Sequence, residues 1–188
     1  RQRGKVAYFH LLDVSTGRVH PTRLSPSGQE GDLDWSPISP SIAFVDNAYI
    51  REDGRRVSQI WIMGDDGSEA EPLTDGTSNN LSPSWSPDGT RLLFSSDRDG
   101  DFEIFTMDDD GSALAPVSPE SGLGSAPQAG AWSPDGTQIA FSSADGNADG
   151  HVYVVNADGT GLRRLTQSGS VSGPQWSPDG RWIAFTRN

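Results

Sequence analysis

Short apolar runs alternate with polar, turn-forming stretches along the whole chain. Four of these runs follow a W-S-P tripeptide, at residues 42–44, 92–94, 139–141 and 183–185. Each run is short and rich in β-branched or aromatic residues, which favours strands over helices. No stretch of about ten residues shows helical periodicity or helix caps. The pattern therefore predicts that all regular structure is β.

Three further features follow each of the first three W-S-P runs in a fixed order. A second apolar run comes first ("QIWIMG" from 59, "FEIFTMD" from 102, "HVYVVNA" from 151), then an Asp-Gly pair, then a stretch ending in Leu-Thr or Val-Ser. Asp and Gly suit tight turns, because Asp can bond its own backbone and Gly accepts a positive φ. We therefore expect each unit to be four antiparallel strands joined by turns.

The units repeat at nearly constant spacing. They open near Trp35, Trp85, Trp132 and Trp176, which lie 50, 47 and 44 residues apart. A period of about 40 to 50 residues with strand-like content is typical of β-propeller blades. The last unit stops after two strands, and residues 1–34 match the missing two. We predict one β-propeller domain over residues 1–188, with four blades' worth of four-stranded antiparallel sheet and one blade split between the termini.

The split blade makes a specific pairing prediction. The strand at 182–186 should pair with the N-terminal strand around residues 7–12, within one chain or between chains. Unpaired strand edges promote aggregation, and propellers avoid this by sealing them.

The succession W-S-P-D-G-x-x-I-A-F, an I-Y-V-like strand, D-G and L-T resembles the WD-like propeller repeat of the TolB family. The resemblance covers essentially the whole chain, and three of the four W-S-P-D-G turns are intact. It implies a periplasmic or extracellular interaction scaffold, usually with six blades. Four units depart from that number. A closed four-bladed ring, a fragment of a larger ring and a subunit completed by a neighbour all stay open.

Composition narrows the function classes. The net charge of −12 argues against nucleic acid, because binding phosphates requires clustered Lys and Arg, and the 14 basic residues here are scattered. No apolar run approaches the roughly 18 residues that span a bilayer, so we do not expect a membrane-embedded chain. Cysteine is absent. Because the chain begins at Arg1 without Met, we expect a removed leader or an excised segment.

Catalysis is not expected from these motifs. Propellers similar to this one precede the hydrolase domain of prolyl-oligopeptidase-type peptidases, but the nucleophile elbow G-x-S-x-G of such a hydrolase is not found here. No pair of carboxylates stands out as acid and base.

Two acidic loops suggest calcium. "DGNADG" from 145 matches the first half of a calcium-binding loop, with Asp145, Asn147 and Asp149 as oxygen donors. The bidentate Glu of such loops is missing. In the preceding unit Asp97, Asp99 and Asp101 repeat the alternation of donors. A polar hairpin tip rich in turn formers is the alternative interpretation. We therefore name Ca²⁺ as the one cofactor candidate.

The loop at 45–58 is longer than its counterparts, with 17 residues from Phe44 to Trp61 against 11 from Phe94 to Phe105. Loops on a rigid scaffold commonly carry recognition. The candidate contact residues are Tyr49, Ile50, Arg51, Arg55 and Arg56. An insertion without function is the alternative.

The leading hypothesis is a non-catalytic, extracytoplasmic propeller that binds another protein through loops on one face. The first alternative is a structural subunit that assembles with copies of itself through the split blade. The second is the regulatory propeller of a larger peptidase. Solution mass separates the first two hypotheses.

Overall fold

The computed structural model describes residues 10–21, 30–117, 128–144, 150–167 and 169–187, and every regular element in them is a strand. The strands are β1 (His10–Leu12), β2 (Val19–Pro21), β3 (Glu30–Trp35), β4 (Ser41–Ile50), β5 (Arg56–Gly64), β6 (Glu71–Pro72), β7 (Asn80–Trp85), β8 (Arg91–Ser96), β9 (Glu103–Asp108), β10 (Ala115–Pro116), β11 (Gln128–Trp132), β12 (Gln138–Ala144), β13 (Gly150–Asn156), β14 (Arg163–Arg164), β15 (Val171–Trp176) and β16 (Ile183–Arg187). The all-β prediction is confirmed.

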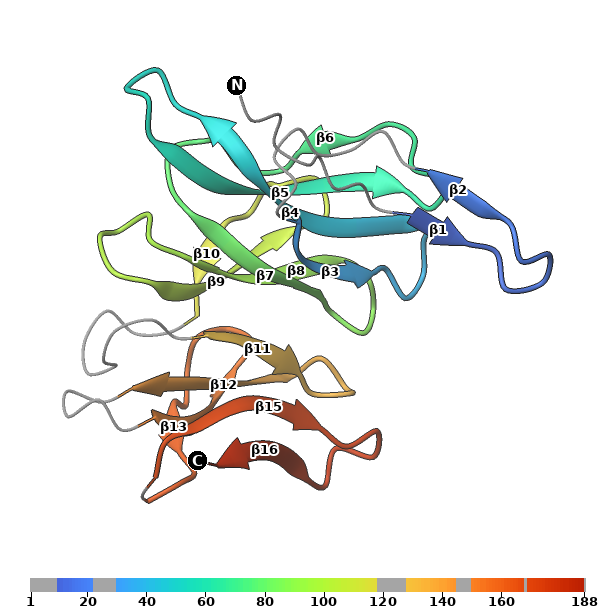
Figure 1. The fold of residues 1–188 in the computed structure, drawn as a ribbon. Coiled ribbons are helices and arrows are strands. Elements are labelled where there is room, and N and C mark those ends of the chain that lie inside the picture. Colours follow the sequence, from blue (N-terminus) through green and yellow to red (C-terminus); the bar gives the residue numbers. More distant parts are fainter. Residues whose placement is uncertain (1–9, 22–29, 118–127, 145–149, 168, 188) are drawn as a thin grey trace.

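The strands form three complete blades between two half-blades (Figure 1). Blade 1 is β3–β6, blade 2 is β7–β10 and blade 3 is β11–β14, each an antiparallel sheet in sequence order. The N-terminal half-blade is the pair β1–β2 and the C-terminal half-blade is the pair β15–β16. First strands of successive units contact one another, β3 with β7, β7 with β11 and β11 with β15. The blades are therefore arranged side by side as in a propeller.

Cross-strand aromatic pairs fix the same register in all three complete blades. Phe44 pairs with Trp61, Phe94 with Phe105 and Phe141 with Tyr153. The ring centroids of these pairs lie 6.5, 6.0 and 5.6 Å apart. Aromatic pairs opposite each other on neighbouring strands stabilise a sheet and specify its register.

The hydrophobic core lies between blades. One cluster joins Ala43 and Ile60 of blade 1 to Trp85, Leu92 and Phe94 of blade 2, and Phe105 and Met107 extend it. A second joins blade 2 to blade 3, and a third includes Leu11 of the N-terminal half-blade. Burying a large apolar side chain contributes roughly 1.5–3 kcal/mol. Each blade is therefore stabilised mainly by its neighbours.

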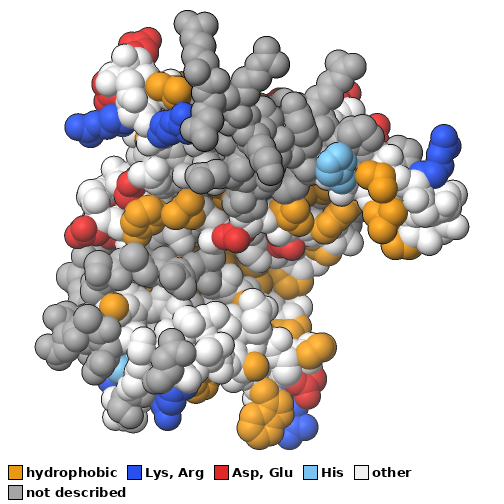
Figure 2. Space-filling model, viewed as in Figure 1, with side chains coloured by type: hydrophobic (Ala, Val, Ile, Leu, Met, Phe, Trp, Pro, Cys, Tyr) orange, Lys and Arg blue, Asp and Glu red, His pale blue; other side chains and the backbone are white. Residues whose placement is uncertain are grey.

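Apolar side chains are more exposed in the first and last units of the structure than at the same positions of the units between them. Phe185 on β16 is 40% exposed, whereas Phe94 and Phe141 at the same position of complete blades are 0% exposed. Trp35, which opens blade 1, is 50% exposed, against 6% for Trp85. Figure 2 shows hydrophobic side chains at the surface along the right-hand side of the molecule.

The predicted pairing of the two half-blades is not formed among the described residues, and residues 7–9 of the predicted N-terminal strand lie outside them. In the described residues β16 pairs only with β15 and β1 only with β2. The half-blades lie at opposite ends of the structure (Figure 1), because three complete blades are stacked between them. For these residues, the prediction that the two half-blades pair within one chain is therefore wrong. Pairing between two chains stays a prediction.

The segment predicted as a loop at 45–58 is mostly strand. β4 continues to Ile50 and β5 begins at Arg56, so only residues 51–55 form the turn. The register shifts between Asp46 and Tyr49, which marks a bulge. An extra residue in one strand breaks the polar and apolar alternation, so the pattern resembled a loop.

Candidate functional site

The β4–β5 hairpin brings the predicted contact residues together at one end of the blades. Tyr49 and Ile50 end β4, and Ile50 pairs with Arg56 at the start of β5. Tyr49 is 43% exposed and Ile50 is 56% exposed. Two large apolar side chains therefore stand at the surface beside arginines, on a hairpin longer than its counterpart in blade 2.

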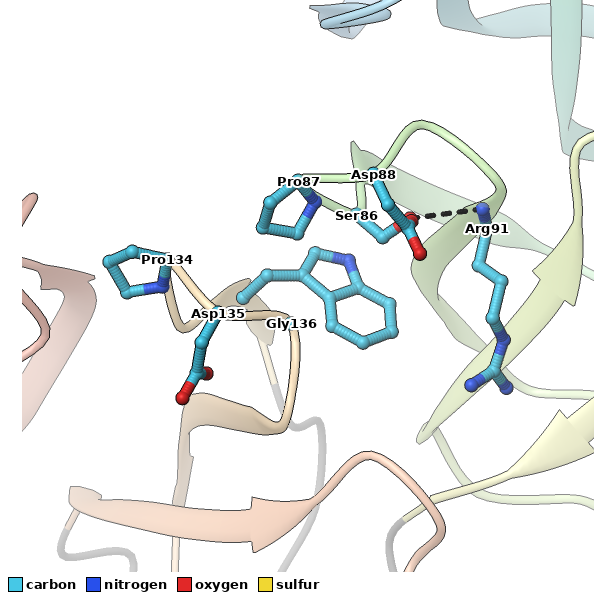
Figure 3. A pocket seen from close by; sticks show the side chains of 8 residues that line it. Ser86, Pro87, Asp88, Arg91, Pro134, Asp135 and Gly136 are labelled. Atoms are coloured by element: carbon cyan, nitrogen blue, oxygen red, sulfur yellow. Dashed lines mark hydrogen bonds between the residues drawn. The ribbon is translucent and has the colours of Figure 1, made fainter.

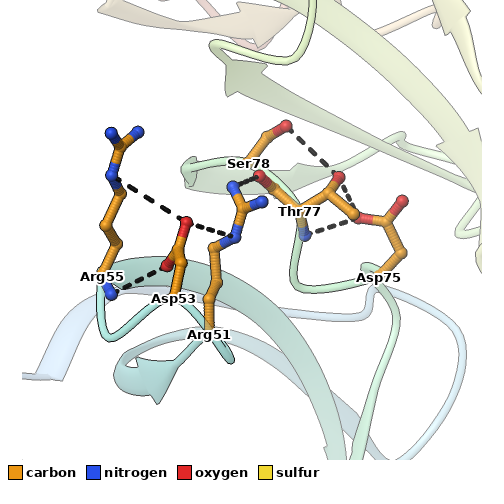
Figure 4. Close-up of polar contacts among 6 residues, drawn as sticks. All are labelled: Arg51, Asp53, Arg55, Asp75, Thr77 and Ser78. Atoms are coloured by element: carbon orange, nitrogen blue, oxygen red, sulfur yellow. Dashed lines mark hydrogen bonds and ion pairs between the residues drawn. The ribbon is translucent and has the colours of Figure 1, made fainter.

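The arginines of this hairpin are held to different extents (Figure 4). Arg51 donates from Nη1 to the carbonyl oxygen of Thr77 at 2.6 Å, and its Nε lies 3.8 Å from Asp53 Oδ2. The Nε of Arg55 lies 3.9 Å from the same oxygen, but its side chain is 81% exposed. The main-chain N–H of Arg55 also donates to Asp53 Oδ1 at 2.9 Å. Arg51 is thus fixed against the next loop, whereas Arg55 projects into solvent.

Tyr49 packs against the loop that connects blade 1 to blade 2. Gly76 of that loop has φ +75°, and a Cβ added there would lie 2.5 Å from Tyr49 Cε1. The ring therefore occupies the space that a side chain at residue 76 would need. The hairpin and residues 73–79 form one continuous surface, which we call the hairpin surface.

A buried glutamine makes the 73–79 loop rigid. Gln59 is 1% exposed, and its Oε1 accepts hydrogen bonds from Thr74 Oγ1 at 2.6 Å and the N–H of Gly76 at 2.8 Å. Its Nε2 donates to the carbonyl of Ser78 at 2.7 Å. Buried polar groups that are fully hydrogen-bonded specify one conformation. The hairpin surface is therefore preorganised.

The carboxylate at the edge of this surface stays ionised. Burial acts to raise the pKa of Asp75, but the N–H and hydroxyl of Thr77, together with the nearby charge of Arg98, outweigh it. The pKa of Asp75 therefore lies below its ordinary value. Figure 4 shows the Thr77 contacts of Asp75 beside Arg51.

Arg98, a residue that the sequence did not single out, is held over the core. Its guanidinium lies 5.0 Å from the ring centroid of Phe105 and 5.6 Å from that of Phe94. It donates to Ser96 Oγ at 3.2 Å and to Asn80 Oδ1 at 3.1 Å. Burial lowers the pKa of Arg98 from its ordinary value. The alternating aspartates of "DRDGD" suggest metal ligands, but the arginine between the first two packs over the rings of Phe94 and Phe105.

The predicted calcium ligands are only partly within the described residues. Both carboxylate oxygens of Asp97 accept hydrogen bonds from Asn79, at 2.7 Å from its N–H and 2.6 Å from its side-chain amide. Asp99 and Asp101 are exposed. The described ranges contain no group of three or more His, Cys, Asp or Glu residues that could hold a metal ion. Asp145, Asn147 and Asp149 lie outside them, so calcium binding stays a prediction.

A pocket lies at the other end of the blades, between the W-S-P-D-G turns of blades 2 and 3 (Figure 3). Its volume is about 400 Å³, and its lining consists of Ser86, Pro87, Asp88, Arg91, Trp132, Pro134, Asp135 and Gly136. The indole of Trp132 lines the pocket together with Pro87 and Pro134, which come from the two turns. The Cζ of Arg91 lies 5.9 Å from the indole centroid. The pocket thus combines an aromatic wall with charged groups at its rim.

The two aspartates of the pocket are locked in their turns. Hydrogen bonds from the hydroxyls of Ser86 and Ser133 lower the pKa of Asp88 and Asp135, and the N–H and hydroxyl of Thr90 and Thr137 lower it further. The serine hydroxyls lie 2.6 Å from the Oδ1 atoms of these aspartates. The sequence pattern marks these residues only as turn formers, because the pocket exists only where two blades meet.

Contacts between successive W-S-P turns continue from blade to blade. Ile38 lies where a Cβ on Gly89 would stand. The Cδ of Pro87 would lie 3.7 Å from a Cβ on Gly136, and that of Pro134 would lie 3.8 Å from a Cβ on Gly180. The turns therefore form a row in which each touches the next.

Comparison with known proteins gives a consistent family. A family model described as the TolB beta propeller domain matches residues 3–129. An uncharacterized protein of Agrobacterium fabrum is 29% identical over 193 residues, which cover 98% of this chain and 62% of that protein. The Tol-Pal system protein TolB of Syntrophus aciditrophicus is 42% identical over 127 residues, covering 60% of this chain and 28% of that protein.

Other similar proteins include enzymes. An uncharacterized peptidase of Bacillus subtilis is 28% identical over 156 residues, covering 82% of this chain and 17% of that protein. The chain thus spans less than two thirds of each of these relatives.

Solved structures share the fold. The crystal structure of TolB from Acinetobacter baumannii matches with a TM-score of 0.70 and 23% identity, over 94% of this chain and 42% of that one. An oligogalacturonate lyase in complex with manganese matches with a TM-score of 0.69 and 20% identity, over 94% and 49%. The part of the chain that the structure describes has no helix long and apolar enough to cross a membrane.

Proposed function

Because this chain belongs to the TolB β-propeller domain family, we propose that it is a non-catalytic propeller module that binds another protein through the hairpin surface. We place it in the periplasm or outside the cell, as the resemblance to TolB proteins of the Tol-Pal system suggests. The observation that carries the proposal is the exposure of Tyr49 and Ile50 on a preorganised hairpin. Aromatic and aliphatic anchors beside arginine are typical of binding hot spots.

The hairpin surface suits recognition for a further reason. Arg51 and the 73–79 loop are already fixed by hydrogen bonds, so a partner would not have to order them on binding. Preorganisation increases affinity because less conformational entropy is lost. Arg55 and Arg56 would act at the rim, where charges mainly affect the association rate.

The test uses site-specific photo-crosslinking in the source organism, with the crosslinker in place of Tyr49 or, as control, in place of Ser112 at the opposite end of blade 2. We expect one protein to crosslink from residue 49 and not from residue 112. The purified protein should then bind the chain, and Tyr49→Ala with Ile50→Ser should weaken that binding at least about tenfold. Unchanged affinity in this variant would exclude the hairpin surface as the contact.

Self-assembly is a second candidate, favoured by the 40% exposure of Phe185 and by a β16 that pairs only with β15 among the described residues. In that case β1 of a second copy would add to β16 and complete the split blade. A third candidate is the regulatory propeller of a larger peptidase, favoured by the similarity to the Bacillus subtilis peptidase. A hydrolase domain in the same gene would support it.

Calcium binding by the 145–149 segment is a separate proposal. Asp145, Asn147 and Asp149 would supply side-chain oxygens, and without a bidentate Glu the affinity would be low, on the order of 10⁻⁴ to 10⁻³ M. Saturating calcium should raise the melting temperature, because the ion binds only the folded loop. Melting in millimolar calcium and in chelator should differ for the parent and not for Asp145→Ala with Asp149→Ala. Equal melting of the parent in both buffers would refute it.

A further inference from the structure

The turns at the end of the blades opposite the hairpin surface carry a persistent negative charge. In antiparallel four-stranded blades, the first and third connections lie at one end and the second at the other. The first and third connections, together with the turns of the two half-blades, form what we call the turn face. Figure 1 shows several of these turns on the right-hand side, opposite the β4–β5 connection.

Seven aspartates lie on the turn face, and the same chemistry holds each of them ionised. A side-chain hydroxyl of a neighbouring Ser or Thr is the largest influence lowering each pKa, and main-chain N–H groups add to it. The residues are Asp13, Asp66, Asp88, Asp110, Asp135, Asp158 and Asp179. Arginines are fewer here. Among the described turn and strand-end residues they are Arg18, Arg91, Arg163 and Arg181. The face therefore attracts cations.

The pocket between blades 2 and 3 gives this face a concave, apolar site. Trp132, Pro87 and Pro134 supply its apolar walls, and Asp88 and Asp135 stand at the rim, one on each turn (Figure 3). In both Asp88 and Asp135 the Oδ1 atom accepts the hydrogen bonds of the turn, and the Oδ2 atom accepts none from the described residues. Both carboxylates can therefore accept a further donor without giving up their turn.

Arg91 does not neutralise this rim. Its Nη2 donates to Thr106 Oγ1, its guanidinium lies over the Trp132 ring, and Figure 3 shows it on the side of the pocket away from Pro87 and Pro134. It forms no ion pair with a carboxylate in the ranges that the structure describes. The guanidinium is thus held by Thr106 and the Trp132 indole, while the carboxylates remain at the opening.

From this arrangement we propose that the pocket binds a basic, extended segment of a partner protein, with an arginine or lysine side chain inserted between the two turns. The aliphatic stem of the side chain would lie along the proline rings and the indole, and its charged group would pair with Asp88 or Asp135. Long basic side chains commonly bury their stems on apolar surface while the charge meets a carboxylate. The site is separate from the hairpin surface, and the two proposals can fail independently.

The test measures binding of a fluorescein-labelled peptide of alternating arginine and proline by fluorescence anisotropy at low ionic strength. A glutamate–proline peptide of the same length is the negative control. Asp88→Asn with Asp135→Asn should raise Kd about tenfold, because both partner charges are lost while the Oδ1 acceptors remain. Asp66→Asn with Asp110→Asn removes two charges from outer turns of the same face, and should change Kd less than about twofold.

A further variant is expected to act in the opposite direction. Arg91→Gln removes the like charge from the pocket, and Gln138 already occupies the corresponding position of blade 3, at the start of β12. The peptide should bind this variant about two- to threefold more tightly. Weaker binding by Arg91→Gln would contradict the proposed orientation of the ligand.

Mapping the site on the parent protein does not depend on the folding of any variant. A benzophenone-bearing form of the arginine–proline peptide should crosslink to residues 86–91 and 132–136. Crosslinks confined to other turns would overturn the proposal. So would equal weakening by the two aspartate pairs, which would indicate attraction by net charge alone, or an absence of measurable binding to the parent.

Discussion

Trp132 of blade 3 donates its indole Nε1–H to the main-chain carbonyl of Ser84 in blade 2, at 3.2 Å. Trp176 repeats the contact one blade further on, with the carbonyl of Ala131 at 3.2 Å. The repeated tryptophan is thus both an apolar group in the core and a polar link to the preceding blade. Trp85 is similarly buried, but its Nε1 has no hydrogen-bond partner among the described residues.

This difference predicts unequal costs for the same substitution. Trp132→Phe should lower the free energy of unfolding by about 2–3 kcal/mol, because it loses packing and leaves the Ser84 carbonyl without its donor. Trp85→Phe removes similar packing and no hydrogen bond, so it should cost about 1 kcal/mol less. Urea denaturation of both variants gives the comparison. Equal costs would mean that the indole hydrogen bond adds no net stability.

Acid should destabilise the chain through the turn aspartates. Their pKa values are lower in the folded state than the ordinary value of 3.8. The stabilisation is therefore present above about pH 4 and is lost as the pH falls through the folded pKa values. Replacing Asp88, Asp135 and Asp179 by Asn should flatten the fall of the melting temperature below about pH 4. Ser86→Ala, which removes the main donor to Asp88, should change the slope in the same direction. A slope unchanged in the triple variant would contradict this account.

Gly76 should tolerate a side chain less well than Gly54. Both have a positive φ, +75° and +81°, so alanine is strained at either position by about 1 kcal/mol. At Gly54 the added Cβ meets nothing within 4 Å, whereas at Gly76 it meets the ring of Tyr49. Gly76→Ala should therefore lower the melting temperature more than Gly54→Ala, and should displace Tyr49. Similar melting of the two variants would show that the ring moves away freely.

If the chain self-assembles, the exposed apolar side chains of its C-terminal half-blade should make it associate at high concentration. Trp182 is 70% exposed and Phe185 is 40% exposed on the C-terminal half-blade. Sedimentation velocity should then show association that increases with concentration in the parent. Trp182→Ser with Phe185→Ser should abolish it, while Val14→Ser, at a turn position 92% exposed, should not. A parent that stays monomeric throughout would exclude assembly through the split blade.

Local patterns predicted most of the fold and little of the candidate sites. The four antiparallel strands of blade 2 follow from short apolar runs separated by turn-forming residues, which a single segment of sequence specifies. The bulge near Asp46 breaks the alternation of polar and apolar residues, so the sequence of the extended β4–β5 hairpin predicts a loop. Arg98 and the Trp132 pocket depend on residues from separate strands or blades. Contacts between residues so distant in sequence leave no periodic signal in either segment.

The row of touching turns also bears on how such chains evolve. Every contact in it joins nearest neighbours, such as Pro87 with the turn at Gly136 and Pro134 with the turn at Gly180. Unequal recombination between two copies of the repeat would insert or delete one period of DNA and recreate the same junction on both sides. Selection can therefore change the number of units in a gene without first redesigning any boundary, since energies in repeat architectures are dominated by adjacent units.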